Sequence, residues 1–251
     1  MSNVFEHYRG NEQFVARVLD WMNQCERRYR CIITPFLTPQ ELAAAKSVIG
    51  KQLFVYEDGG YPDAERKRLL IAPFENVHEG FSIVCLKSEY RKRNRVLTHR
   101  DILGALMNQG IKRDQIGDLL VQDENIYMFV RSELSELIMR ECTTIGSCAV
   151  AFCEYEGEIH FEQRLSIHTV SVSSMRLDAV TAACIHTSRS KAQALIKGKC
   201  VKVNQIPLED CRYLCNNNCT VSIRGHGRYN IRSDGRISRK GKIVIEIGTY
   251  Q

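Results

Sequence analysis

The 251-residue sequence contains no apolar run long enough to span a bilayer, which takes about 20 residues. It also lacks the apolar stretch of a signal peptide, because residues 1–21 are charged and amphipathic. Hydrophobic residues make up 44% of the chain and charged residues 25%, as in ordinary soluble domains. We therefore expect a cytoplasmic protein with no membrane contact and with two or three small domains.

Closely spaced cysteine pairs are missing as well. The chain has eleven cysteines, an odd and scattered set, so a disulfide framework is not expected without a secretory signal. Cys211, Cys215 and Cys219 are separated by three residues each, and His226 could supply a fourth ligand, but structural zinc sites generally use tighter pairs. Cys219 opens a predicted strand, where cysteine often behaves as a small buried hydrophobe. We therefore favour buried thiols over a metal site.

Charge is distributed unevenly along the chain. Residues 171–251 hold 14 Lys and Arg against 5 Asp and Glu, a net charge of +9, whereas residues 1–170 hold 21 against 24, a net charge of −3. Concentrated positive charge attracts polyanions at long range and releases counterions when phosphates replace them. A solvated lysine-rich surface is the alternative, but the excess lies in one compact block. The pattern favours RNA binding by the C-terminal part.

Residues 1–75 have the pattern of a mixed α/β domain. Thr38 is a predicted helix N-cap with Pro39 at the first helical position, and Gly50 ends that helix. The runs QLFVYE and RLLIAPF flank a turn-rich segment and predict a β-hairpin.

Residues 76–170 predict the order β-α-β-β-α-β, which is typical of ferredoxin-like and RRM-like domains. Thr98 and Asp101 predict a capping box at the first helix, and Ser132 is the predicted cap of the second. The runs SCAVAFCEY and EQRLSIHTV are expected to supply the closing strands. The Gly-Phe signature with which RRM domains stack bases is missing from IYMFVRS. We therefore expect packing, or contact with a protein partner, from this domain.

Residues 176–251 form the third predicted domain, so the whole chain is of the α+β class. Two short helices and a strand are predicted first, with Leu195 and Ile196 on the buried face of the second helix. Ser188 is the predicted N-cap of that helix, and a helix N-terminus offers unpaired N–H groups that suit a phosphate. The residues of this block expected to contact RNA are Arg176, Ser188, Arg189, Lys191, Gln193, Lys197, Lys199 and Lys202.

A glycine-containing hairpin follows. The run TVSIRGHGRYNI predicts two strands joined at Gly225 and Gly227, and Asp234-Gly235 is a further turn signal. Arginine side chains can hold phosphates, and a tyrosine ring can stack on a base. Four more residues are therefore expected to contact RNA: Arg224, Arg228, Tyr229 and Arg232.

Two resemblances rest on these motifs. Arg-Leu-Asp, Ser-Arg-Ser-Lys-Ala with Leu-Ile-Lys-Gly, and Val-Lys-Val-Asn resemble the RNA-binding domain named after small-subunit ribosomal protein S-four, over ~75 C-terminal residues. RGHGRY and the stretch at residues 97–118 resemble the YlmH family of bacterial cytoplasmic proteins over nearly the whole chain. These resemblances imply binding to structured ribosomal RNA or tRNA on the large subunit, notably on stalled subunits holding peptidyl-tRNA. They also imply an indirect link to cell division.

Catalytic signals are weak. No glycine-rich cofactor loop follows an N-terminal strand, and Gly225 and Gly227 do not open a helix. His99 and Asp101 could form a catalytic pair, but both fit the first turn of a capped helix. We therefore expect no catalytic residues and no cofactor. The alternative is an RNA-modifying enzyme, pseudouridine synthase-like or methyltransferase-like, with an appended RNA-binding domain. A protein partner held by residues 1–170 is compatible with the RNA-binding interpretation.

Overall fold

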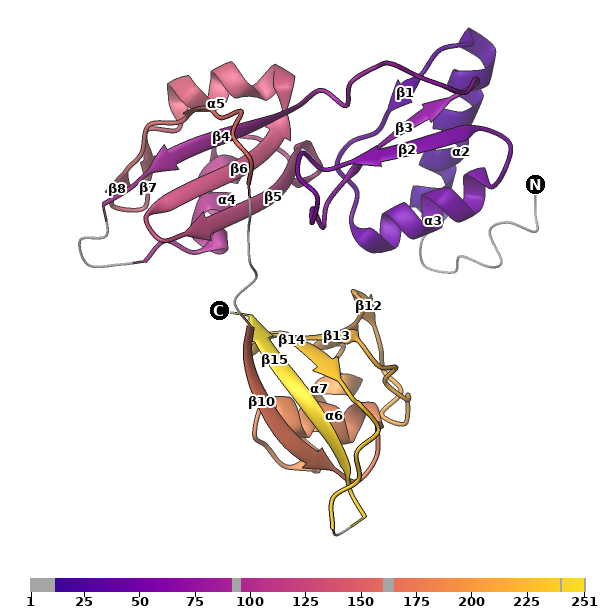
Figure 1. The fold of residues 1–251 in the computed structure, drawn as a ribbon, viewed down its shortest axis with the longest axis vertical. Helices are drawn as coiled ribbons and strands as arrows, with labels where there is room; N and C mark the ends of the chain where they lie inside the picture. Colours follow the sequence, from indigo (N-terminus) through magenta and orange to yellow (C-terminus); the bar gives the residue numbers. More distant parts are fainter. Residues whose placement is uncertain (1–11, 92–95, 160–164, 240, 251) are drawn as a thin grey trace. The chain divides into compact units, whose positions relative to one another are not determined.

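The computed structural model describes residues 12–91, 96–159, 165–239 and 241–250. Figure 1 shows that this part of the chain is an α+β protein of short helices and antiparallel sheets. The chain divides into two compact units, Met1–Phe161 and Glu162–Gln251. No helix of the described residues is long and apolar enough to cross a membrane.

The first unit begins with two helices packed on a small antiparallel sheet. Its elements are α2 (Glu12–Arg28), β1 (Ile32–Ile33), α3 (Pro39–Ile49), β2 (Phe54–Asp58) and β3 (Arg68–Ala72). The sheet order is β1-β3-β2, and the pairing of β2 with β3 confirms the predicted hairpin. The predicted start of α3 is also confirmed, because the Thr38 hydroxyl accepts from the Glu41 N–H at 3.3 Å and the Glu41 carboxylate accepts from the Thr38 N–H at 2.8 Å.

A second antiparallel sheet follows in the same unit. Its region contains β4 (Ile83–Glu89), α4 (His99–Asn108), η1 (Arg113–Gln115), β5 (Ile116–Gln122), β6 (Asn125–Arg131), η2 (Ser132–Leu134), α5 (Ser135–Glu141), β7 (Thr144–Ile145), β8 (Cys148–Ala149) and β9 (Cys153–Glu154). Four of the strands form one sheet in the order β5-β6-β4-β9, with antiparallel neighbours. The four strands of this sheet and helices α4 and α5 follow the predicted order β-α-β-β-α-β, but β7 and β8 form a separate pair before the last strand. Thr98 and Asp101 form the predicted capping box of α4.

Two local predictions are wrong in this region. Ser132 does not cap the second helix, because it starts the 3-10 turn η2, and α5 begins only at Ser135. The run SCAVAFCEY is not one strand, since β8 pairs with β7 whereas β9 pairs with β4. Val150 and Phe152 lie between these two strands and are buried in the core. The backbone therefore leaves one sheet to bury these side chains before it joins the other.

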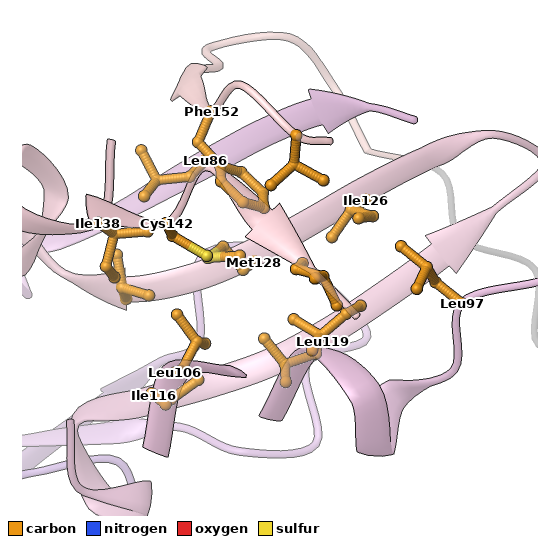
Figure 2. Packing of buried hydrophobic residues seen from close by; sticks show 14 of the residues in the cluster. Leu86, Leu97, Leu106, Ile116, Leu119, Ile126, Met128, Ile138, Cys142 and Phe152 are labelled. Atoms are coloured by element: carbon orange, nitrogen blue, oxygen red, sulfur yellow. The ribbon is translucent and has the colours of Figure 1, made fainter. Parts of the chain in front are cut away.

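The core of this region lies between the sheet and its helices. Figure 2 shows Leu86 and Met128 from neighbouring strands facing Leu106 of α4 and Ile138 of α5. All four side chains are fully buried. Because residues alternate between the two faces of a strand, the neighbouring Lys87 and Tyr127 belong to the opposite face of the sheet.

The second unit joins two helices to a larger antiparallel sheet. Its elements are β10 (Leu165–Val172), α6 (Leu177–Cys184), α7 (Arg189–Lys197), β11 (Val201–Val203), β12 (Ile206–Pro207), β13 (Cys219–Ile223), β14 (Gly227–Arg232) and β15 (Ile243–Tyr250). Within the described residues the sheet order is β10-β15-β14-β13-β11-β12. The pairing of β13 with β14 confirms the predicted hairpin around Gly225.

The strand predicted in EQRLSIHTV belongs to this unit and not to the preceding domain. β10 pairs with β15 along its whole length, from Leu165 opposite Tyr250 to Val172 opposite Ile243. The prediction was wrong because the partner strand lies near the end of the chain, and local periodicity carries no information about such distant pairing. The boundary between the compact units accordingly falls after Phe161.

Helices α6 and α7 pack on one face of this sheet (Figure 1). Leu177, Val180 and Ile196 are fully buried against strand residues that include Val221. Leu195, predicted on the buried face of α7, is only partly buried and packs at the margin of the core. The core therefore depends on Ile196 more than on Leu195.

This packing predicts that the same Leu-to-Ala substitution changes the stability of the unit by different amounts at a buried and at an exposed position. Leu177 is 0% exposed and Leu214 is 64% exposed in the same unit. Leu177→Ala should lower the free energy of unfolding by about 2–5 kcal/mol, because it leaves a cavity, whereas Leu214→Ala should change it by no more than ~0.5 kcal/mol. Hydrogen exchange of the β13 and β14 amides measures both effects. Equal protection in the two variants would show that the helices do not stabilise the sheet.

Candidate RNA-binding surface

A buried carboxylate organises the basic residues of the two helices. Asp178 lies in the first turn of α6, and its side chain is 0% exposed. It accepts hydrogen bonds from Arg176 at 3.0 and 3.2 Å, from Arg189 at 2.9 Å and from Gln193 at 2.9 Å. Three of the predicted RNA-binding residues therefore meet at one anion. We call these four residues the Asp178 cluster.

The cluster keeps its carboxylate charged. Burial raises the pKa of Asp178, but the hydrogen bonds from Arg189, Arg176 and Gln193 lower it by more, so the net pKa lies well below the usual value. The pKa of Arg189 is raised because its guanidinium donates to Asp178. A guanidinium has five N–H donors, and Arg189 is exposed, so donors remain for a second anion. The cluster therefore holds two cations in fixed positions at the surface.

Helix α7 carries the next basic residues. The Ser188 hydroxyl accepts from the Lys191 N–H at 3.3 Å, which confirms Ser188 as the N-cap. Lys191 and Lys197 are exposed on the helix. Lys199, just beyond its end, is exposed but forms an ion pair with Glu209 at 3.1 Å. Lys191 and Lys197 are therefore the simpler candidates for contact with phosphates.

Three more cations, Lys202, Arg228 and Arg232, lie on the open face of the sheet. Lys202 is opposite Ser222, and Ser222 is opposite Arg228, so the three residues form a row across β11, β13 and β14. Lys202 is exposed and Arg228 is partly buried. Arg232, also exposed, lies opposite Glu246 of β15, which reduces the local positive charge. The best-placed pair on this face is Lys202 and Arg228.

Tyr229 was expected to stack on a base, but its side chain is not accessible for stacking. It is 7% exposed, belongs to the core of the second unit, and its hydroxyl donates to the His226 carbonyl at 2.9 Å. The alternation of the strand explains this burial, because Tyr229 and the buried Ile231 share one face whereas Arg228 lies on the other. The same alternation, read in the sequence, could have excluded Tyr229 beforehand.

The predicted residues thus fall into separate groups. The Asp178 cluster, Lys191 and Lys197 belong to the helical side, whereas Arg228 lies on the sheet face turned away from the helices. Arg224 is exposed in the turn between β13 and β14, where its N–H donates to the Cys200 carbonyl at 2.8 Å. The role of Asp178 was not predicted from the sequence. The available signal was an acidic residue within an otherwise basic block.

The surroundings of the cysteines, and of His99 from the possible catalytic pair, indicate structural roles. Cys215 and Cys219 are buried in the core of the second unit. Among the residues that the structure describes, no group of three or more His, Cys, Asp or Glu is arranged to hold a metal ion. In the first unit, burial raises the pKa of Cys85 to about 12, whereas partial loss of hydration and the positive charge of Arg113 lower the pKa of the exposed His99. Both groups are therefore neutral at pH 7.

These features define a class of protein. It is an α+β protein in which an acidic first unit precedes a compact second unit whose helices display anchored cations. A family model described as "YlmH, N-terminal" matches residues 10–76, and one described as "Putative RNA-binding domain in YlmH" matches residues 77–158.

Full-length similarity identifies the family. A relative from Bacillus subtilis (strain 168), named ribosome-associated protein quality control protein P2, is 31% identical over 254 residues, which cover 98% of this chain and 99% of the relative. A solved structure named cell division protein ylmH from Streptococcus pneumoniae is 27% identical with a TM-score of 0.52, and the match covers 58% of this chain and 91% of that chain. The chain belongs to the YlmH family.

The Asp178 cluster predicts a specific dependence of stability on pH. Because the folded-state pKa of Asp178 lies below the value of about 3.9 for an unfolded Asp, the stabilisation is present above about pH 4 and is lost as pH falls through the folded-state pKa. Asp178→Asn should therefore cost about 2–4 kcal/mol at pH 7, and the difference from the unaltered chain should shrink in acid.

Denaturant unfolding between pH 7 and pH 2.5 measures this difference. Asp234→Asn is the matched control, since Asp234 is exposed and pairs with Arg236 at the surface. That variant should unfold at the same denaturant concentration as the unaltered chain. A deficit of Asp178→Asn that stays constant across the whole pH range would contradict the ionised cluster.

Proposed function

We propose that this protein binds structured RNA of the large ribosomal subunit, together with tRNA, through its second unit. In this proposal the unit is an RNA-binding domain of the S-four type, and the protein acts in quality control of stalled translation without catalysing a reaction. The observation that carries the proposal is the Asp178 cluster, which fixes Arg176 and Arg189 beside the exposed Lys191 and Lys197. The name of the Bacillus subtilis relative supports the ribosomal context.

Anchored arginines suit an RNA backbone for a physical reason. A free arginine side chain loses about 2 kcal/mol of rotamer entropy when it is immobilised. Arg176 and Arg189 have already lost much of this freedom through their bonds to Asp178. Binding a phosphate then costs less ordering entropy, as in any preorganised site. The net charge of the C-terminal part adds long-range attraction to RNA.

The first unit adds a second contribution in this proposal. Its residues 77–158 match a family model whose description names RNA binding, whereas the missing base-stacking signature favours contact with a protein. Both contacts are compatible with attachment to a ribosomal subunit, which contains RNA and protein. The structure from Streptococcus pneumoniae is named for cell division, and we propose that any such link is indirect, through translation.

Neutralising exposed lysines should weaken RNA binding without unfolding the chain. The affected contact is between each ammonium group and a phosphate, and each lost contact should reduce the log–log salt slope by about 1 from an initial value near −4 to −5. The test variant is Lys191→Gln with Lys197→Gln, compared by co-sedimentation with large subunits at several salt concentrations. Lys51→Gln, an exposed lysine of the first unit, is the control. An unchanged slope in the double variant would refute contact through α7.

Arg189 should have two roles, in stability and in RNA binding, whereas Lys197 should have only the second. Arg189→Ala removes a donor from the buried Asp178 and also an exposed cation, so both stability and RNA affinity should fall. The expected loss in affinity is about tenfold. Lys197→Ala should lower affinity but leave the melting temperature within about 1 °C, because Lys197 is exposed. Thermal melts beside co-sedimentation separate the two roles. Full RNA binding by both variants would place the RNA contact elsewhere.

A further inference from the structure

The first unit contains an open cavity on the sheet face turned away from its core. The cavity has a volume of about 480 Å³. Aromatic rings of Tyr61, Phe129 and Tyr155 line it, together with the carboxylate residues Glu156 and Glu158. No Lys or Arg is among the residues that line the cavity in the described part of the chain. Within the described residues, the cavity is therefore partly aromatic and the charged groups that line it are acidic.

The aromatic wall is built and held by contacts within the protein. The rings of Tyr61 and Phe129 are stacked with centroids 4.8 Å apart, and the Tyr61 hydroxyl donates to Asp118 at 2.9 Å. Gly60 allows this approach, because a Cβ atom at that position would lie 2.5 Å from the Phe129 ring, and its φ is +93°. The wall is thus fixed by packing, hydrogen bonding and backbone conformation.

On this face, a cation of the protein itself lies close to aromatic rings. The ammonium group of Lys87 lies 5.4 Å from the ring centroid of Tyr155 and 5.7 Å from that of Tyr127. Aromatic faces attract cations through their quadrupole, and nearby carboxylates add to the attraction. A phosphate placed in the cavity would instead lie close to Glu156. The electrostatics of the cavity therefore favour a cation over an anion.

We propose that this cavity binds the guanidinium or ammonium group of a basic side chain from a protein partner. The adjoining strand supports a peptide as the source of that cation. β9 is an edge strand of its sheet, and both of its residues, Cys153 and Glu154, are exposed. An extended segment of a partner can pair with such an edge, which places one of its side chains beside Tyr155. This contact is independent of RNA binding by the second unit.

The test uses the full chain and a fluorescent peptide of alternating Arg and Gly. A second peptide replaces each Arg by citrulline, which keeps the shape of the side chain but removes its charge. Fluorescence anisotropy at physiological salt should show binding of the arginine peptide and binding at least about tenfold weaker for the citrulline peptide. Equal affinity for the two peptides would overturn the proposal, and so would no binding of the arginine peptide.

Charge reversal locates the contact. Glu156→Lys should weaken binding of the arginine peptide by about tenfold, whereas Glu136→Lys should change it by less than about twofold. Both glutamates are exposed residues of the first unit, but Glu136 is on helix α5 and outside the cavity. The two variants change the net charge of the protein equally. Equal weakening by both would show that only general electrostatic attraction is present and would overturn the proposal.

An aromatic substitution tests the wall itself. Tyr155→Leu should weaken binding of the arginine peptide, and Tyr155→Phe should preserve it, because the ring and not the hydroxyl faces a cation. If Tyr155→Leu fails to fold, the exposed Glu156→Lys still decides the question.

The same variants distinguish a basic peptide from RNA. Glu156→Lys should leave co-sedimentation with large subunits through the second unit unchanged, so a failure of RNA binding would not affect the peptide result. Tighter binding of a short single-stranded oligoribonucleotide by Glu156→Lys, with no response to the arginine peptide, would assign the cavity to nucleic acid and overturn the proposal.

Discussion

The ion pairs of Asp178 are the interaction on which the second unit depends. A fully buried carboxylate is destabilising unless hydrogen bonds and opposite charges compensate for its lost hydration. Asp178 obtains them from Arg176, which precedes α6, and from Arg189 and Gln193 of α7. The same contacts therefore join the two helices and fix the direction of the cations. Any change that loosens the helix pair also disperses the proposed phosphate site.

Pairing of distant strands is the second constraint on this unit. β15 lies between β10 and β14, so the sheet closes only when the last strand inserts between two earlier ones. The helices bury their apolar residues against the face of this sheet. The support of the Asp178 cluster thus includes strand contacts of large sequence separation. The function proposed for the helices requires the whole unit.

Local signals in the sequence predicted three helix starts correctly, although Ser132 does not cap α5. Thr38, Thr98 and Ser188 cap helices as expected, because an N-cap depends on residues within one helical turn. The partner of β10 was missed because it lies near the end of the chain. Tyr229 was expected at the surface because arginines surround it in the sequence, but strand alternation places it on the buried face of β14.

The Asp178 cluster and the aromatic cavity share the property that made them difficult to predict. Each joins side chains from separate segments, such as Arg176 with Gln193 or Tyr61 with Phe129. Their chemistry is nevertheless opposite, because one displays cations around a buried anion and the other displays carboxylates around aromatic rings. They lie in different compact units. The cations of the Asp178 cluster attract RNA, whereas the carboxylates of the aromatic cavity disfavour it. A polyanion and a basic peptide therefore need not compete for one site.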